Sequence, residues 1–115
     1  MRVSVVVPVL NAAAWLPDLF AALREQTVMP CEVILVDSGS TDRTRSIAEG
    51  ESPVRVVDIE TFSHGRARNL GAREARGEVI VLMTQDALPV DERWLERLLS
   101  PFDDPQVALT YSRQI

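Results

Sequence analysis

The chain has 115 residues, of which 46% are hydrophobic and 25% are charged, and its formal net charge is -5. A chain of this length forms a single domain, and the composition is typical of a globular protein rather than of a disordered or disulfide-stabilised one. The negative charge argues against a protein that binds nucleic acid, because such proteins carry a clustered positive excess. We therefore expect one globular domain without a nucleic-acid partner.

Cysteine, histidine and the N-terminal segment bear on where the protein works. Cys31 and His64 are the only residues of their types, so the chain can form no internal disulfide and offers no cluster for structural zinc. The apolar run near the N-terminus is interrupted by Pro8 and Asn11, which makes it too short for a signal sequence or a membrane span. These features predict a protein of the reducing cytoplasm.

Short apolar runs alternate along the chain with segments of helical character. The runs predict strands at residues 3–7, 33–36, 54–59, 79–83 and 107–111, with the first, second and fourth buried in the sheet. Apolar spacing and capping residues predict helices from Leu16 to near Thr27, from Ser40–Asp42 to near Gly50, over 65–76, and from Asp91 to about 102.

Two helix ends are predicted from capping residues. Gly77 stands where the C-terminal cap of the helix over 65–76 is expected, since glycine readily adopts the left-handed conformation of such caps. Asp91 stands where an N-cap is expected, with Val90 and Leu95 spaced to form a hydrophobic staple across the helix entry.

This alternation predicts an α/β fold, a mostly parallel sheet with helices on both faces, of the Rossmann-like type. Sheets of this kind bind their ligands at the carboxyl ends of the strands. The candidate site therefore consists of the segments that follow three predicted strands, at residues 8–11, 37–42 and 84–86.

Asp37 ends the second predicted strand and opens a turn of small hydroxyl and acidic residues that runs to Asp42. Because it lies at the carboxyl end of a central strand, we interpret Asp37 as a ligand-binding carboxylate. The alternative is an Asx-turn without a ligand. Ser40 and Asp42 are interpreted as capping residues of the following helix, since serine and aspartate bond local backbone groups.

Asp86 follows the fourth predicted strand and is expected near Asp37. A carboxylate there can bind a divalent cation, Mg or Mn, together with the phosphates of a substrate. One carboxylate alone makes a weak metal site, so a purely structural turn is the alternative.

The segment from Phe62 to Gly71 is a helix entry rich in glycine and arginine. Backbone N–H groups and a guanidinium at such an entry can bind a diphosphate. Arg68 and Asn69 lie in the first turns and are the expected ligands, whereas His64 is either a structural hydrogen-bonding residue or a catalytic one. The other arginines are expected on a solvated helix face: Arg66, Arg73 and Arg76.

Three segments resemble, in order, the successive motifs of family 2 glycosyltransferases: Val5–Asn11, Val36–Asp42 and Gly65–Gly71. The resemblance covers essentially the whole chain, and Gly77–Ile80 before the acidic motif supports it. It implies that residues 1–115 are the nucleotide-sugar-binding part of a GT-A fold that is truncated here. It also implies an inverting transfer from a nucleotide-diphosphate sugar to a glycan or lipid-linked acceptor in cell-surface polysaccharide synthesis.

The resemblance also assigns roles by position. Pro8 and Asn11 resemble the first nucleotide-contacting loop, Asp37 resembles the carboxylate that recognises the base, and Arg68 resembles the basic residue near the nucleotide. Asp86 resembles the central carboxylate of the acidic motif, which would hold the metal. The expected nucleotide-sugar-binding set is completed by adjoining residues: Ser38, Asn69 and Gln85.

The acidic motif departs from the usual pattern of the family, which is commonly Asp-x-Asp-Asp. Here it is Thr84-Gln85-Asp86-Ala87, which leaves metal dependence open. Together with Phe62-x-His64-Gly65 and the closing Tyr111-Ser112-Arg113-Gln114, this form is similar to the rhamnosyltransferase-like branch. That branch implies a dTDP-linked deoxysugar such as dTDP-rhamnose.

In the family the catalytic base and the acceptor site lie in a further part, expected beyond residue 115, so no catalytic residue is assigned. We expect these residues to be a fragment that binds the donor without transferring sugar, a stand-alone small protein being the alternative. A missing part would leave apolar surface that favours a homodimer, and the full protein is expected to associate peripherally with the inner face of the membrane.

Two other function classes stay open on the same fold. One is a different nucleotide-dependent α/β enzyme, such as a Rossmann dehydrogenase or a nucleotidyltransferase. NAD binding is disfavoured, because the segment 8–11 stands where the glycine fingerprint of a dinucleotide site is required. The other is a non-catalytic nucleotide-binding module.

Overall fold

A computed structural model describes residues 2–60 and 63–103 of the chain. The elements in chain order are β1 (Val3–Val9), α1 (Leu16–Arg24), β2 (Glu32–Asp37), α2 (Thr44–Glu49), β3 (Val54–Asp58), α3 (His64–Glu74), β4 (Val79–Leu82), α4 (Trp94–Leu99) and the 3-10 helix η1 (Ser100–Asp103). The strands of this part form one sheet in the order β3-β2-β1-β4, and every pair is parallel.

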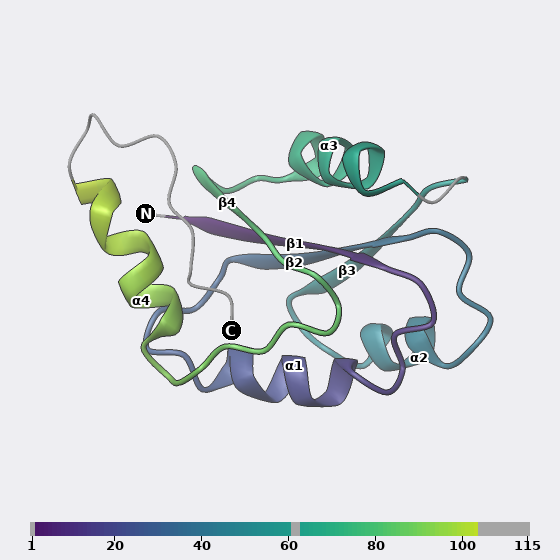
Figure 1. Cartoon of the computed structure of the whole chain (residues 1–115), viewed down its shortest axis with the longest axis horizontal. Coiled ribbons are helices and arrows are strands. Elements are labelled where there is room, and N and C mark those ends of the chain that lie inside the picture. Colours follow the sequence, from purple (N-terminus) through teal and green to yellow (C-terminus); the bar gives the residue numbers. More distant parts are fainter. Residues whose placement is uncertain (1, 61–62, 104–115) are drawn as a thin grey trace.

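Helices cover both faces of the sheet: α3 lies on one face, and α1 and α2 lie on the other (Figure 1). Alternate residues of β1 enter two separate cores, as the period of a strand requires. Val5 and Val7 pack with residues of α1 and α4, whereas Val6 packs with Ala67 of α3. The predicted α/β fold with helices on both faces is confirmed.

The predicted strands within the described residues are observed with small shifts at their ends. β1 continues through Pro8 to Val9, although the sequence predicts an end at Val7. Proline is accepted there because β4 pairs with β1 only as far as Val6, so β1 has no ladder to form on that side at Pro8. The strand predicted at 107–111 lies outside the described residues.

The prediction that β4 is buried like the first two strands is wrong for the described part of the molecule. Val81 is buried, but Ile80 is 39% exposed and Leu82 is 50% exposed. The reason is the position of β4 at the edge of the described sheet, since α3 packs mainly against β1 and β2.

The predicted cap at Gly77 is also wrong. α3 ends at Glu74, and its C-cap is Ala75, whose backbone is extended. Gly77 serves a different purpose, because a Cβ atom there would lie 2.7 Å from both the N and the Oγ of Ser4. Glycine is therefore required for the close approach of this segment to the start of β1.

Two helix entries are later than predicted. α2 begins at Thr44 instead of at Ser40–Asp42, because the side chains of that segment bond the loop after β1. α4 begins at Trp94, and Asp91 Oδ1 accepts from Arg93 N without acting as the N-cap. Val90 is 68% exposed, so the predicted staple to Leu95 does not form.

Among the helices of the described residues, none combines the length and the apolar character needed to cross a bilayer.

Candidate functional site

The candidate site lies at the carboxyl edge of the sheet. β1 and β2 end side by side, with Val9 opposite Asp37, and Asp37 is in turn opposite Asp58 at the end of β3. β4 lies on the other side of β1. The N-terminus of α3 belongs to the same edge, because this helix connects the end of β3 to the start of β4.

The loop after β1 is held in place by the loops after β2 and β4. Four consecutive backbone N–H groups, those of residues 10–13, each donate a hydrogen bond to a side-chain oxygen from one of those segments. The acceptors are Gln85 Oε1 at 2.9 Å, Ser40 Oγ at 2.9 Å, Thr44 Oγ1 at 2.8 Å and Asp42 Oδ2 at 3.1 Å. The three loops are therefore one connected unit.

Asn11 occupies a strained position in this loop. Its φ is +50°, in the left-handed region that asparagine tolerates better than most residues. Its side-chain Oδ1 accepts from Thr41 N at 2.8 Å and from Thr41 Oγ1 at 3.4 Å. Asn11 thus fixes the loop after β1 against the loop after β2.

Asp37 is buried, with 2% of its surface exposed. Its Oδ1 accepts from Gly39 N at 3.1 Å, from Ser40 N at 2.9 Å and from Ser40 Oγ at 2.7 Å. Its Oδ2 lies 3.8 Å from Nε of Arg45, which also pairs with Asp58. The Asx-turn of the alternative interpretation therefore forms, and it uses one carboxylate oxygen while the other faces Arg45.

Asp42 and Ser40 act on the loop after β1 as well as on their own turn. Ser40 Oγ donates to Asp37 and accepts from Asn11 N. The hydrogen bond from the Thr44 side chain, followed by those from the backbone N–H groups of Thr44 and Ala13, holds the pKa of Asp42 below its ordinary value despite the opposing effect of burial. The carboxylate of Asp42 is thus ionised and serves as an acceptor.

Pro8 and Ser38 belong to the strand ends and have little exposed polar surface. Pro8 is buried within β1, opposite Val36. Ser38 is half-buried, and both its N and its Oγ donate to Val9 O, at 3.2 and 3.4 Å. The structure therefore places both residues in the framework of the strand ends.

Asp86, Arg68 and Asn69 are exposed, and within residues 2–60 and 63–103 no partner of their side chains is found. Gln85 differs, because its amide oxygen holds Leu10 N. β2 and β4 flank β1, so the axes of these two strands lie about 10 Å apart, which is two strand spacings. Asp37 and Asp86 thus stand on opposite sides of the loop after β1.

The described residues contain no cluster of three or more His, Cys, Asp or Glu that could hold a metal ion. Asp86 can supply a single carboxylate ligand. A divalent cation would need its remaining ligands from phosphate oxygens and water, as Mg²⁺ commonly does. His64 is the first residue of α3, and Ser63 caps this helix by accepting from Arg66 N at 3.4 Å.

Four residues of the site were not predicted from the sequence in the roles that the structure gives them. Thr44 and Gln85 hold the loop after β1, and Arg45 and Asp58 form the ion pair beside Asp37. The only signal that the sequence offers for these residues is that they lie at the ends of β2, β3 and β4 or just after them.

Comparison with known proteins agrees with this architecture. The model of the family described as "Glycosyl transferase family 2" matches residues 4–114. The O-antigen chain rhamnosyltransferase RfbN of Salmonella typhimurium is 33% identical over 100% of this chain and 38% of its own length. The O-antigen chain rhamnosyltransferase WbaN of Salmonella anatum is 37% identical over 97% of this chain and 36% of its own length.

A solved structure of the mannosyltransferase PcManGT from Pyrobaculum calidifontis, in complex with GDP-Man and Mn²⁺, superposes with a TM-score of 0.80. It is 33% identical and the match covers 92% of this chain and 33% of that one. The chain thus spans little more than a third of the length of the curated relatives that it matches. The family match extends over almost the entire sequence, and the fold agrees with it: the chain belongs to glycosyl transferase family 2.

Proposed function

We propose that this chain binds the sugar donor of an inverting glycosyltransferase, an enzyme that transfers a sugar from a nucleotide-diphosphate sugar to a glycan or lipid-linked acceptor in cell-surface polysaccharide synthesis. The observation that carries the proposal is the connected unit of three loops at the carboxyl edge of the sheet. Four consecutive N–H groups fix the loop after β1 between the loops that bear Asp37 and Asp86.

In this proposal the nucleotide lies across the loop after β1. Asp37 accepts an N–H of the base through the carboxylate oxygen that the Asx-turn leaves unused, and Pro8, Asn11 and Ser38 form the surface beneath the nucleoside. Arg68 and Asn69, in the first two turns of α3, face the diphosphate, where a guanidinium and a helix N-terminus favour negative charge.

We assign the metal to Asp86, with Mg or Mn as the cation. When bound, the cation would neutralise charge on the departing nucleotide diphosphate. Asp86 is exposed and supplies one carboxylate, so in this proposal the cation takes its other ligands from the phosphates of the donor and from water. PcManGT, which was solved with GDP-Man and Mn²⁺, supports the same pairing of nucleotide and metal.

We assign dTDP-rhamnose as the donor, since two relatives that match nearly the whole chain are rhamnosyltransferases. Their names refer to an O-antigen chain, which supports a glycan acceptor. The cytoplasm, at the inner face of the membrane, is the proposed location, and the single Cys31 suits that reducing compartment. Exposed apolar side chains of β4, Ile80 and Leu82, support a homodimer; light scattering over a dilution series tests it.

Thermal unfolding with and without nucleotides tests the donor proposal. At a ligand concentration 100 times the Kd, a ligand of the native state adds about 2.7 kcal/mol, which raises the Tm of a domain of this size by about 10 °C. We expect dTDP, with Mg or Mn, to give such a shift and NAD to give none. A shift with NAD alone would support a dehydrogenase-like enzyme, and no shift with any nucleotide would support a non-catalytic module that does not bind nucleotides.

A further inference from the structure

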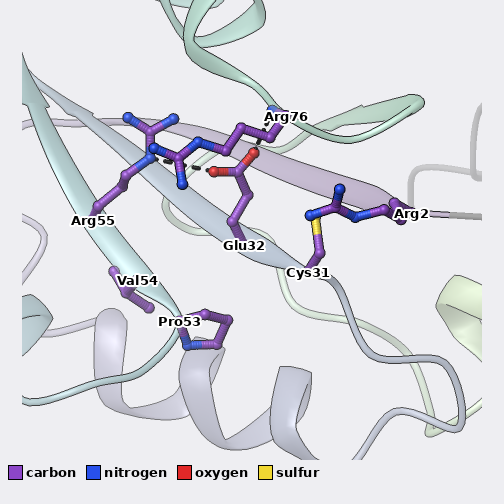
Figure 2. Close-up of a pocket in the computed structure, with 7 residues that line it drawn as sticks. All are labelled: Arg2, Cys31, Glu32, Pro53, Val54, Arg55 and Arg76. Carbon is purple, nitrogen blue, oxygen red and sulfur yellow. Dashed lines mark hydrogen bonds and ion pairs between the residues drawn. The ribbon is translucent and has the colours of Figure 1, made fainter.

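A pocket of about 250 Å³ lies at the amino edge of the sheet, opposite the edge that carries the donor loops. Its lining includes Arg2, just before β1, Cys31 and Glu32 at the start of β2, Arg55 of β3, and Arg76, just before β4. Because the strands are parallel, their starts share one edge, and Figure 2 shows Arg55 and Arg76 beside Glu32, with Arg2 and Cys31 to one side. Three of them are arginines, in a chain whose net charge is -5.

Glu32 is the one acidic residue in this lining, and both of its carboxylate oxygens already accept hydrogen bonds. Glu32 is 7% exposed, and its Oε1 accepts from Arg55 Nε at 3.2 Å. Its Oε2 accepts from Ser4 Oγ and from Arg76 N, both at 2.6 Å. Burial by itself would raise the pKa of Glu32, but these hydrogen bonds and the charge of Arg55 hold that pKa below its ordinary value. Glu32 is therefore ionised, and it balances Arg55.

Each of the three guanidinium nitrogens of Arg55 also donates a hydrogen bond already. Besides the bond from Nε to Glu32, its Nη1 donates to Glu74 Oε2 at 3.2 Å, and its Nη2 donates to the backbone oxygen of Glu74. Arg55 is thus held in place by two glutamates that balance its charge.

The side chains of Arg2 and Arg76 differ from that of Arg55, because they have no such partners among the described residues. Their guanidinium groups make no hydrogen bond or ion pair with any of the residues 2–60 and 63–103. Their backbone groups, in contrast, are fixed: Arg76 N donates to Glu32, and Arg2 O accepts from Glu78 N at 2.8 Å. Glu78 approaches the backbone N of Arg2, at 3.5 Å, and not the guanidinium. The pocket is therefore lined by two guanidinium groups without partners among the described residues, and the backbone of both residues is held by hydrogen bonds.

We propose that this pocket binds a phosphate-bearing anion, in the class of phosphate monoesters and diphosphates, at a site separate from the donor site. Guanidinium groups bind phosphate oxygens through paired N–H donors, and two unpaired guanidiniums match an anion of charge about -2. At roughly 30 Å³ per water, the pocket has the volume of several water molecules, which is room enough for an inorganic diphosphate.

Cys31 is a built-in reporter for this site, because it lines the pocket, is half-buried and is the only cysteine of the sequence. We would measure the rate at which an anionic and a cationic methanethiosulfonate of similar size modify it. The ratio of the two rates reports the local potential, since the ionisation of the thiol affects both rates equally. We expect the anionic reagent to react about tenfold faster or more, and inorganic diphosphate to slow both reactions.

Arg2→Gln and Arg76→Gln are the test variants, and Arg73→Gln is the matched control. Arg76→Gln keeps the backbone bond to Glu32, so it removes only the guanidinium. Arg73 is an exposed residue of α3 outside the pocket, and its substitution changes the net charge equally. We expect each test variant to lower the rate ratio several-fold and to weaken protection by diphosphate, and Arg73→Gln to leave both unchanged.

Two results would overturn the proposal: no protection of Cys31 by diphosphate in the wild-type protein, or equal effects of Arg73→Gln and Arg76→Gln. Vesicles distinguish the source of the phosphate group. Protection by diphosphate but not by phosphatidic acid vesicles indicates a free anion, and protection by both, with phosphatidylcholine vesicles inactive, indicates that a lipid headgroup is also accepted. The donor proposal is judged separately, because its readout is the response of Tm to nucleotides and not the reactivity of Cys31.

Discussion

The two carboxylate oxygens of Asp37 make different contacts, and two substitutions separate the effects of those contacts. Oδ1 accepts three hydrogen bonds that build the turn after β2, while Oδ2 faces Arg45 at 3.8 Å. Asn keeps an oxygen that can accept the three bonds but removes the charge. Ala removes both.

The magnitudes follow from the contacts. Each of the three bonds contributes about 0.5 to 1.5 kcal/mol, so Asp37→Ala should cost roughly 1.5 to 4.5 kcal/mol of folding free energy. The contact with Arg45 is long and its partner is 45% exposed, which limits its contribution to at most about 1 kcal/mol. Asp37→Asn should therefore be only mildly destabilising. In the proposed role it also loses a charged hydrogen bond to the base, worth about 1.5 to 3 kcal/mol, a tenfold to hundredfold rise in Kd.

Urea denaturation measures the first quantity, and titration calorimetry with dTDP measures the second. An Asp37→Asn protein that is folded by circular dichroism and binds dTDP as tightly as the wild type would exclude the carboxylate from base recognition. If Asp37→Ala is no less stable than Asp37→Asn, the account of the turn is wrong, even if the binding result stands.

Three further predictions concern the metal, acid stability and helix packing. Asp86→Ala should abolish the gain in dTDP affinity that Mn or Mg gives in calorimetry, whereas a gain equal to that of the wild type would remove Asp86 from the metal site. The folded-state pKa of Glu32 is lowered from 4.5, so its carboxylate stabilises the fold fully above about pH 4.5 and progressively less as the pH falls through the lowered value. Urea denaturation of Glu32→Gln at several pH values should therefore show a smaller loss of unfolding free energy on acidification. A loss equal to that of the wild type would contradict this account. Gly71→Ala places a Cβ 2.2 Å from Val6 Cγ1 and should cost about 1 to 3 kcal/mol, with Gly65→Ala, which meets nothing within 4 Å, as the helix control.

Within the described residues, the order of strands and helices could be predicted from the sequence because each β-branched run marks a strand, while α1 and α4 carry their own apolar spacing. The burial of a strand, in contrast, could not be predicted from its composition. The run at β4 has the composition of a central strand, yet Ile80 and Leu82 are substantially exposed in the described structure. Composition records what a segment can bury, and only the position in the sheet decides which face is covered.

The helix caps predicted at Gly77 and Asp91 are wrong because contacts with other parts of the chain decide the conformation there. Gly77 lies close after a helix, and the sequence predicts a cap there, but its lack of a side chain serves the approach to Ser4, 73 residues away in the sequence. Asp91 likewise has the residue type of an N-cap, while its two side-chain oxygens accept from Arg93 N and from Arg97. Capping preferences describe helix ends in isolation, and these two segments are set by their neighbours.

At the candidate site, the sequence predicts that Asp37 and Asp86 lie at the carboxyl edge of the sheet, but it does not predict how the loops at that edge are held. Asp37 and Asp86 could be assigned to that edge because parallel strands end together. The bonds that fix the loop after β1 could not be predicted, since their donors are backbone N–H groups, which nearly every residue has. The acceptors are also remote, with Ser40 and Gln85 lying 29 and 75 residues from the amides they bind.

The conformation of the loop after β1 depends on the pairing of the strands in the sheet. β2 and β4 each deliver acceptors to the loop after β1, so the loop takes its conformation only when both strands are paired with β1. The left-handed Asn11 is a local cost of that conformation, and the bond that its side chain accepts from Thr41 offsets part of it. A ligand that lies on this loop therefore meets a surface already ordered by folding, which reduces the entropy lost on binding.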